Sequence, residues 1–406
     1  MEKTTATIAI VGAGVSGLIA AKTLEAQGYN PIVFESSDEV GGRVRTDWEK
    51  GIAFDRGFQV LLTAYPETRK HLDFKGLQLL HFKPGALIFA KGKTHRIGDP
   101  LRDISALWPT IITSVGSLKD KLKIFSLSQA LKSKSVDAIF AETETTTLTY
   151  LKNYGFSDRI IAHFFKPFFT GIFLEEALQT SSRMFEFVFK MFAEGSAAIP
   201  EKGIGAISQQ LNDQLKTTQF QWATTVNQLE TKKLHLDEGK TAHAHAVIAT
   251  APLAGSREQP KWKSCHNFYF EVAQQRFDTG LIGLVADSDA AINNLYYLFP
   301  KQTDGRLVLS VTVVKETGLE LAALTERVST ELQQYCGITT KALLKHYHIK
   351  KALPDLQDLK MYNSERFVTD NGIWYAGDIH LNGSLNAAML SGEEVANAVS
   401  NTLSSF

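Results

Sequence analysis

The sequence predicts an α/β protein with two domains, one of which is assembled from separated parts of the chain. Three observations support this. A strand, a glycine turn, a helix and a second strand follow one another within the first 35 residues, a similar strand and a small-residue helix lie near the C-terminus, and a phenylalanine-rich stretch lies between them. The chain has 406 residues, of which 44% are hydrophobic and 21% charged. This composition is typical of a globular protein, and the length suffices for a large core.

The N-terminal segment has the pattern of a dinucleotide-binding unit. Residues 7–11 form an apolar run that we expect to be a buried strand, and the motif GAGVSG follows at residues 12–17. Apolar residues then recur at helical spacing as far as Gly28, and residues 31–34 form a second β-prone run that ends at Glu35. This order of strand, glycine motif, helix, strand and acid is the Rossmann-like fingerprint.

Each part of this unit has a physical role. Gly12 permits the tight turn, Gly14 lets a pyrophosphate approach the backbone, and Gly17 lets the helix pack closely on the sheet. The helix N-terminus offers free N–H groups and partial positive charge to the phosphates. Glu35 can accept two hydrogen bonds from an adenosine ribose. Its charge would repel a 2′-phosphate, which disfavours NADP.

A second glycine loop distinguishes between nicotinamide and flavin dinucleotides. The sequence VGGRVRT at residues 40–46 is followed by FDRGF at residues 54–58. Here the chain resembles the flavin-containing amine oxidase superfamily, which includes phytoene desaturases and protoporphyrinogen oxidases. In that family the loop lies against the pyrophosphate and ribityl chain of FAD. The resemblance implies FAD as the cofactor, with Arg43 supplying charge to the phosphates.

The C-terminal segment matches the closing motif of the same family. A β-prone run at residues 373–376 ends in Gly377-Asp378, and small residues follow from 383 to 392. By the resemblance, Asp378 would bind the ribityl hydroxyls or a phosphate, and Ser384 would open the last helix beneath the flavin. A helix N-terminus there would stabilise the negative charge of reduced flavin.

A third segment completes the resemblance and divides the chain. Residues 200–211 resemble a family turn and helix, and residues 222–229 and 245–252 are β-prone runs with a turn between them. Val226 matches a family valine whose backbone bonds the adenine. We expect residues 1–75, 196–255 and 352–406 to form a discontinuous, Rossmann-like FAD-binding domain. Residues 76–195 and 256–351 would form an α+β substrate domain with a mixed sheet and a helical insert.

The resemblance assigns FAD binding to residues in all three segments. They are Gly12, Gly14, Val15, Ser16, Gly17, Glu35, Ser36, Gly41, Gly42, Arg43, Val226, Gly377, Asp378, Ser384, Leu385 and Ala388. No catalytic residue is identified. No His, Cys, Asp or Glu cluster has metal-ligand spacing, so we expect no metal.

The substrate domain is rich in phenylalanine. Residues 164–192 carry nine of the 25 phenylalanines, and four apolar side chains between 185 and 192 fall on one helical face. These residues predict a domain core, or alternatively the wall of an apolar tunnel. We expect residues 295–300 and 307–314 to be strands that roof the flavin, with Tyr296 and Tyr297 as candidate lining residues.

Composition excludes several other classes. The chain has 43 basic and 43 acidic residues, which argues against a nucleic-acid partner. Its two cysteines predict neither a disulfide scaffold nor a dithiol motif, but two buried, reduced thiols. Residues 104–118 are apolar but too short to span a bilayer. We interpret them as a buried helix or loop, or alternatively as a surface segment that dips into one membrane leaflet. We therefore expect a cytoplasmic protein, with peripheral membrane association under the second interpretation.

The sequence predicts an FAD-dependent oxidoreductase that dehydrogenates, or desaturates, a small apolar substrate by hydride transfer to flavin N5. A flavin amine oxidase is the first alternative. It is disfavoured because residues 277–287, which match the family's lysine-bearing strand, contain no lysine, and because Trp374 and Tyr375 are the only candidates for an aromatic cage. A redox-neutral, FAD-dependent isomerase is the second alternative. Substrate identity, electron acceptor and oligomeric state are open at this point.

Overall fold

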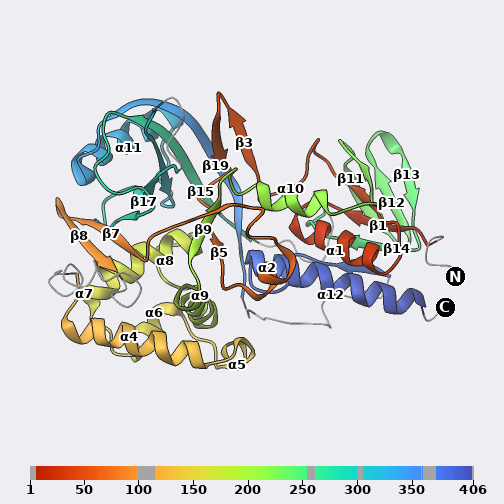
Figure 1. The fold of residues 1–406 in the computed structure, drawn as a ribbon, viewed down its shortest axis with the longest axis horizontal. Helices are drawn as coiled ribbons and strands as arrows, with labels where there is room; N and C mark the ends of the chain where they lie inside the picture. The colour runs from red at the N-terminus through yellow and green to blue at the C-terminus, as the bar shows by residue number, and fades with distance from the viewer. Residues whose placement is uncertain are drawn as a thin grey trace.

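The computed structural model describes residues 6–98, 115–253, 261–299, 305–357, 359 and 372–404. Its first strand, β1 (Ile8–Val11), is buried and lies at the centre of a five-stranded sheet in which every pairing is parallel (Figure 1). In spatial order the strands are β10 (Gln219–Gln221), β2 (Ile32–Phe34), β1, β14 (Ala246–Ala249) and β20 (Ile373–Tyr375).

Two layers cover this sheet because the side chains of β1 alternate between its faces. Ile8 and Ile10 pack into one core with α1 (Val15–Ala26), α10 (Ala206–Asp213) and α12 (Leu385–Ser404). Ala9 and Val11 pack into another core with residues of a three-stranded antiparallel sheet. That sheet consists of β11 (Val226–Glu230), β12 (Lys233–Leu236) and β13 (Thr241–His243).

The strand register brings distant parts of the chain to one edge. Val11 pairs with both Phe34 and Ala249, so β1, β2 and β14 end together. The segments that follow these strands, which begin at Gly12, Glu35 and Thr250, therefore meet there. In parallel sheets this carboxyl edge is where ligands bind.

One expected strand is placed differently. Residues 222–229 were predicted as one strand, but β11 begins at Val226 and Trp222 lies outside it, stacked on Phe220. The chain turns at Ala223, whose φ of 48° lies in the left-handed region and interrupts extended structure. The region expected to be a simple turn before β14 contains β12 and β13.

A second, seven-stranded sheet forms the other main body (Figure 1). The spatial order is β19 (Thr340–Asp355), β15 (Lys261–Val272), β18 (Val308–Val313), β17 (Ile292–Tyr297), β16 (Ile282–Val285), β7 (Gly85–Ala90) and β8 (Lys93–Gly98). All pairings in this sheet are antiparallel except that of β16 with β7, and α11 (Leu321–Cys336) packs on one face. The strands predicted at residues 295–300 and 307–314 correspond to β17 and β18. The expected domain boundary at residue 352 falls within β19.

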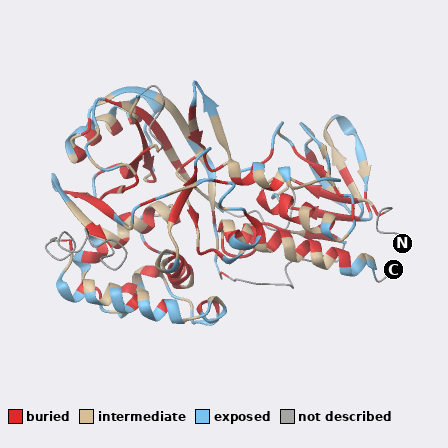
Figure 2. Ribbon diagram, viewed as in Figure 1, coloured by how far each residue is buried: buried red, intermediate tan, exposed pale blue. Residues whose placement is uncertain are grey.

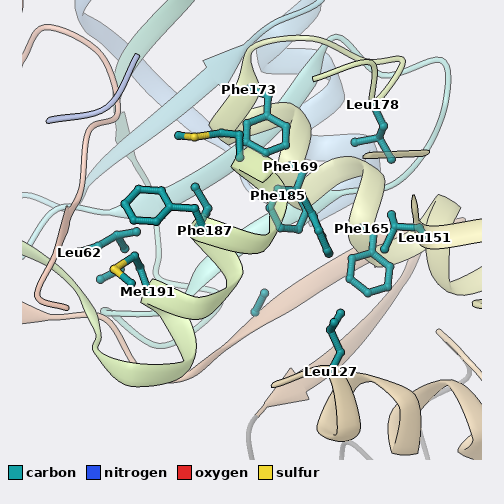
Figure 3. Packing of buried hydrophobic residues seen from close by; sticks show 14 of the residues in the cluster. Leu62, Leu127, Leu151, Phe165, Phe169, Phe173, Leu178, Phe185, Phe187 and Met191 are labelled. Atoms are coloured by element: carbon teal, nitrogen blue, oxygen red, sulfur yellow. The ribbon is translucent and has the colours of Figure 1, made fainter. Parts of the chain in front are cut away.

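A helical region packs beside this sheet. Its helices are α4 (Leu118–Ser133), α5 (Val136–Ala141), α6 (Thr147–Asn153), α7 (Asp158–Ile160), a π-helical turn (Ile161–Phe165), α8 (Lys166–Phe173) and α9 (Ser182–Glu194). Phe165, Phe169, Phe185 and Phe187 are fully buried between these helices (Figure 3). Figure 2 shows that the outer face of α4 is exposed while α9 is largely buried. Most of the phenylalanine-rich stretch is thus core.

Smaller elements connect the two bodies. They are the hairpin of β3 (Thr46–Glu49) and β4 (Ile52–Asp55), the sheet of β5 (Leu61–Leu62), β9 (Ala197–Pro200) and β6 (Leu79–His81), and the short helix α2 (Pro66–His71). The whole is a mixed α/β architecture. No helix within the described ranges has both the length and the apolarity to cross a membrane, and residues 104–114 of the apolar segment lie outside those ranges.

Candidate functional site

A cavity of about 1170 Å³ begins at the carboxyl edge of the parallel sheet and extends between α8, α9 and the seven-stranded sheet. Its volume exceeds the roughly 300–1,000 Å³ usual for small-molecule pockets, as a site for a dinucleotide and a substrate requires. Most of the predicted cofactor residues line it: Gly12, Gly14, Val15, Ser16, Glu35, Ser36, Gly41, Gly42, Arg43, Val226, Asp378, Ser384, Leu385 and Ala388.

The glycine motif forms a tight turn with one open side. Gly12 has a φ of 104°, and a Cβ on Gly17 would lie 2.0 Å from the Gly12 carbonyl oxygen, so neither position accommodates a side chain. A Cβ on Gly14 would meet nothing within 4 Å. Gly14 is also the N-cap of α1 and makes no side-chain cap. The helix N-terminus is therefore open toward the cavity, as an anionic phosphate requires.

Glu35 is held in place by the same turn. The Ala13 N–H donates to Glu35 Oε2 over 2.7 Å, and the N–H and hydroxyl of Ser37 donate to Oε1 over 2.9 and 2.8 Å. Glu35 is 8% exposed and lines the cavity. Its carboxylate is thus oriented before any ligand binds.

The second glycine loop lies directly against the first. The Gly41 N–H donates to the Ala13 carbonyl over 2.9 Å, and Gly14 and Gly41 form an isolated parallel bridge. Gly41 has a φ of 121°, and its Cβ would meet the Val44 carbonyl at 2.5 Å. The two glycine loops therefore form one continuous wall.

Arg43 projects from this wall toward the C-terminal segment. Its guanidinium pairs with Asp378, lies 5.2 Å from the ring centroid of Trp262, and donates to the Ala352 carbonyl over 3.5 Å. The Arg43 side chain is 40% exposed and that of Asp378 only 8%. A cation and an anion, each predicted to contact the cofactor, thus also neutralise one another.

The closing segment is shaped by capping contacts. The Ser384 hydroxyl donates to Asn382 Oδ1 over 2.7 Å and accepts from the Ala387 N–H over 3.0 Å, at the start of α12. Gly377, with a φ of 140°, donates its N–H to the Ser391 hydroxyl over 2.9 Å. Gly377 and Gly17 stand behind the cavity wall and are not among its lining residues.

The far end of the cavity is apolar. Its lining there comprises Phe168, Ile172, Phe173, Met184, Val188, Phe192, Ile282 and Leu284. Tyr296 and Tyr297, which we considered as lining residues, are buried in hydrophobic cores instead. The strands β17 and β18 contribute Asn294 and Thr312 to the wall.

Several polar lining residues were missed by the sequence reasoning. Lys263 on β15 lies 3.5 Å from Asp355 and donates to the Thr180 hydroxyl over 3.3 Å. Residues 277–287, where the family resemblance would place a lysine, contribute the apolar Ile282 and Leu284 to the lining. The sequence signal that could have identified Lys263 is the presence of a lysine among the aromatic residues of β15.

A second group of polar side chains forms one side of the cavity. Tyr347 donates to Asp47 over 2.7 Å, and Arg56 binds the same carboxylate through two nitrogens. Burial alone would raise the pKa of Asp47, but the hydrogen bonds from Arg56 and Tyr347 outweigh it and hold that pKa below its usual value. Asp47 therefore stays ionised as the common partner of Arg56 and Tyr347.

Neither free cysteine is poised to react. Cys265 and Cys336 are both buried, as expected from the sequence. Cys265 lines the cavity, and burial raises the pKa of its thiol to about 12.

The cradle fits FAD on chemical grounds. An uncapped helix N-terminus beside a side-chain-free Gly14 suits a pyrophosphate, and a fixed carboxylate at Glu35 suits the two hydroxyls of a ribose. The apolar chamber beyond Ser384 leaves room for a flat ring and a substrate.

The comparisons with known proteins agree. The sequence model of a family described as flavin containing amine oxidoreductase matches residues 15–400. The chain is 30% identical over 164 residues to protoporphyrinogen oxidase 2 of Arabidopsis thaliana, covering 40% of this chain and 32% of that protein. It is 33% identical over 129 residues to the L-amino acid oxidase Cdc18 of Crotalus durissus cumanensis, covering 31% and 26%. The matched segments thus span about a third or less of these relatives.

The fold likeness extends over the whole chain. The solved structure of putrescine oxidase bound to putrescine has a TM-score of 0.71 and 17% identity, and the match covers 98% of this chain and 99% of that one. At this identity the likeness concerns the fold, whereas the family match rests on the sequence itself. The chain belongs to the flavin containing amine oxidoreductase family, whose cofactor is FAD.

Proposed function

We propose that this protein is an FAD-dependent enzyme that dehydrogenates a small apolar organic substrate. The observation that carries the proposal is the continuity of one cavity from the glycine turns to a chamber walled by Phe168, Met184, Val188 and Phe192. A substrate in that chamber would lie against the flavin ring, which we place next to Ser384 at the start of α12.

The cofactor role of each lining residue is part of this proposal. The α1 N-terminus and Gly14 would bind the pyrophosphate, Glu35 the adenosine ribose, and Val226 the adenine edge. Arg43 and Asp378 would hold the phosphates and the ribityl chain. Their opposite charges would still neutralise each other, because the two side chains form an ion pair. FAD, when bound, supplies a hydride acceptor at N5.

The chain's contribution to the reaction is to orient the substrate and exclude water. Apolar walls on α8 and α9 favour burial of an apolar molecule at about 25 cal/mol per Å² of surface. Asn294 and Thr312 are buried and hydrogen-bonded, with Asn294 Nδ2 donating to the Thr312 hydroxyl over 3.3 Å. They offer a fixed polar point on an otherwise apolar wall. Hydride removal itself requires no acid or base of the protein. The double bond then forms when the neighbouring carbon loses a proton, which solvent would accept.

The test is to assay the purified holoenzyme anaerobically against substrates of contrasting chemistry. A phytoene and a diapophytoene serve as apolar substrates, and putrescine and L-leucine serve as amines. Bleaching of the flavin absorbance together with a product lacking two hydrogens, for an apolar substrate only, supports the proposal. A product of unchanged mass would indicate an isomerase and overturn it.

Amine oxidation is the second candidate, and one observation favours it. Lys263 and Trp262 bring a lysine and an aromatic ring to the cavity from β15. Rapid bleaching by putrescine or L-leucine, with none by the apolar substrates, would establish this candidate over the first.

A further inference from the structure

A cluster of two carboxylates and one imidazole lies between α2 and α12, away from the cavity lining. Figure 1 shows α2 against α12. Glu67 and His71 are one helical turn apart on α2, and Glu393 comes from α12. His71 Nε2 lies 3.5 Å from Glu67 Oε2 and 3.4 Å from Glu393 Oε2. Within the described ranges, these are the three side chains whose ligand atoms gather closely enough to hold a metal ion.

Two of these atoms are buried without a hydrogen-bond partner. They are His71 Nε2 and Glu67 Oε2. The His71 side chain is 6% exposed and its Nε2 points between the two carboxylates. Buried polar atoms in proteins nearly always have a hydrogen-bond or metal partner. We therefore ask which bound group could contact both His71 Nε2 and Glu67 Oε2 at once.

The spacing answers that question. Two ligands bound about 2.0–2.1 Å from a tetrahedral ion lie about 3.3–3.4 Å apart, which is longer than a hydrogen bond. Both observed separations are close to this edge length. We propose that Glu67, His71 and Glu393 bind one zinc ion, with water as the fourth ligand. One imidazole nitrogen and two carboxylate oxygens are a ligand set that zinc accepts.

Two lysines border the cluster and oppose a cation. Lys70 pairs with Glu393, and Lys22 donates to the His71 carbonyl over 3.3 Å. The Lys70 side chain is 55% exposed, so it can move into solvent or to the other carboxylate oxygen when zinc binds. Lys70 therefore competes with zinc for Glu393, and its removal should strengthen zinc binding.

Zinc at this place would fasten α2 to the helix that closes the cofactor cavity. The two helices are already joined where the Glu67 N–H donates to Asn386 Oδ1 over 3.0 Å. Asn386 lies in the first turn of α12, beside the lining residues Leu385 and Ala388. From the sequence we expected no metal, because no cluster of His, Cys, Asp or Glu has metal-ligand spacing. Glu393 is distant in sequence from Glu67 and His71, so only the fold brings the three together.

The experiment is isothermal titration of ZnCl₂ into the EDTA-treated, dialysed holoenzyme. We expect one equivalent to bind the wild type. H71Q and E393Q each remove a ligand and should weaken binding by more than about 100-fold, since even outer partners of a metal site contribute 10- to 100-fold. K70Q should bind more tightly than the wild type. H235Q is the matched control, because His235 pairs with a single carboxylate, Glu230, at 3.0 Å.

A second control and a second readout keep the result decisive. His266, His346 and His348 form a separate imidazole stack, so H346Q should leave the zinc affinity unchanged. X-ray absorption of the zinc-loaded wild type should show one imidazole and oxygen ligands near 2.0–2.1 Å, and this measurement decides the matter if H71Q does not fold. Absence of binding, equal affinity in H71Q, or several imidazole ligands would overturn the proposal.

Discussion

Arg43 and Asp378 form an ion pair although 335 positions separate them in the chain. The pair joins the second glycine loop to the segment that opens α12. Both residues line the cavity, so the pair also connects two of its walls.

Substitutions of the two partners of this pair should lower the stability of the protein by different amounts. R43Q leaves the buried Asp378 carboxylate without its cation, whereas D378N leaves a guanidinium that is already 40% exposed and can be hydrated. We expect R43Q to lower the free energy of unfolding of the apoprotein by about 1–3 kcal/mol, and D378N by less. Urea unfolding of both variants and the double variant measures this. Equal losses would contradict the burial argument.

Glu35 should matter for FAD affinity beyond its structural contacts. E35Q removes the charge that we propose faces the ribose, and we expect FAD to bind at least about tenfold more weakly, because hydrogen bonds to charged groups contribute about 1.5–3 kcal/mol. Fluorescence titration of the apoprotein with FAD measures this. E25Q is the matched control: Glu25 also accepts backbone N–H bonds, from Lys216, Thr217 and Thr218, but lies outside the cavity. Similar FAD affinities in the two variants would count against the assignment of Glu35.

Glycine substitutions should separate folding from cofactor binding. A Cβ on Gly392 would lie 2.3 Å from the Ser16 carbonyl, and one on Gly17 would lie 2.0 Å from the Gly12 carbonyl, whereas one on Gly14 would meet nothing. G17A and G392A should therefore lose about 1–3 kcal/mol or more of stability. G14A should unfold like the wild type but bind FAD weakly, because its methyl group occupies space proposed for a phosphate. Calorimetry of the apoproteins and FAD titration check both parts.

Asp55 should make stability depend on pH. Burial raises the pKa of its carboxyl to about 6, although hydrogen bonds from the Thr46 hydroxyl and the Ile204 N–H partly offset this. The pKa of Asp55 is higher in the folded than in the unfolded protein. Its contribution to the free energy of unfolding is therefore fully present below about pH 4 and is lost as the pH rises through about 6.

The variant D55N stays neutral, so it should lack this decline. Relative to D55N, the wild type should lose up to about 3 kcal/mol between pH 4 and pH 7. Urea unfolding across that range measures the difference, and parallel pH profiles would show that Asp55 titrates normally.

Phe192 and Phe189 on α9 test the substrate chamber. Phe192 lines the cavity, where its ring contacts Phe168 at a centroid distance of 5.2 Å, whereas Phe189 packs on Phe185 in the core. F192A should raise KM for an apolar substrate roughly tenfold, because it removes apolar contact worth ~1.5 kcal/mol, without changing FAD content. F189A should lower stability and leave KM unchanged. A KM effect in both variants would point to general loosening of α9.

The sequence could predict that the glycine turns and Glu35 lie together at one cavity, because the signals for these residues are local. The turn at Gly12, the open position at Gly14 and the acid at Glu35 follow one another within one strand, turn and helix, and backbone geometry alone fixes their arrangement. The motif at Gly377-Asp378 adds a second local pattern.

The substrate side could not be predicted to the same depth, because tertiary packing decides it. The spacing of Phe185, Phe189 and Phe192 shows a shared helical face, but only the packing of α9 shows that Phe192 reaches the cavity and Phe185 does not. Tyr296 and Lys263 show the same limit, since each lies on a strand whose neighbours are known only in the folded protein.

The pairing of β20 with β14 and of α12 with α1 has a consequence for synthesis on the ribosome. The parallel sheet lacks β20, and the cavity lacks the wall formed by the start of α12, until residues 373–404 have been made. The seven-stranded sheet ends at Asp355 and can assemble earlier. Flavin capture should therefore follow synthesis of β20 and α12, and a chain truncated before residue 373 should emerge without colour.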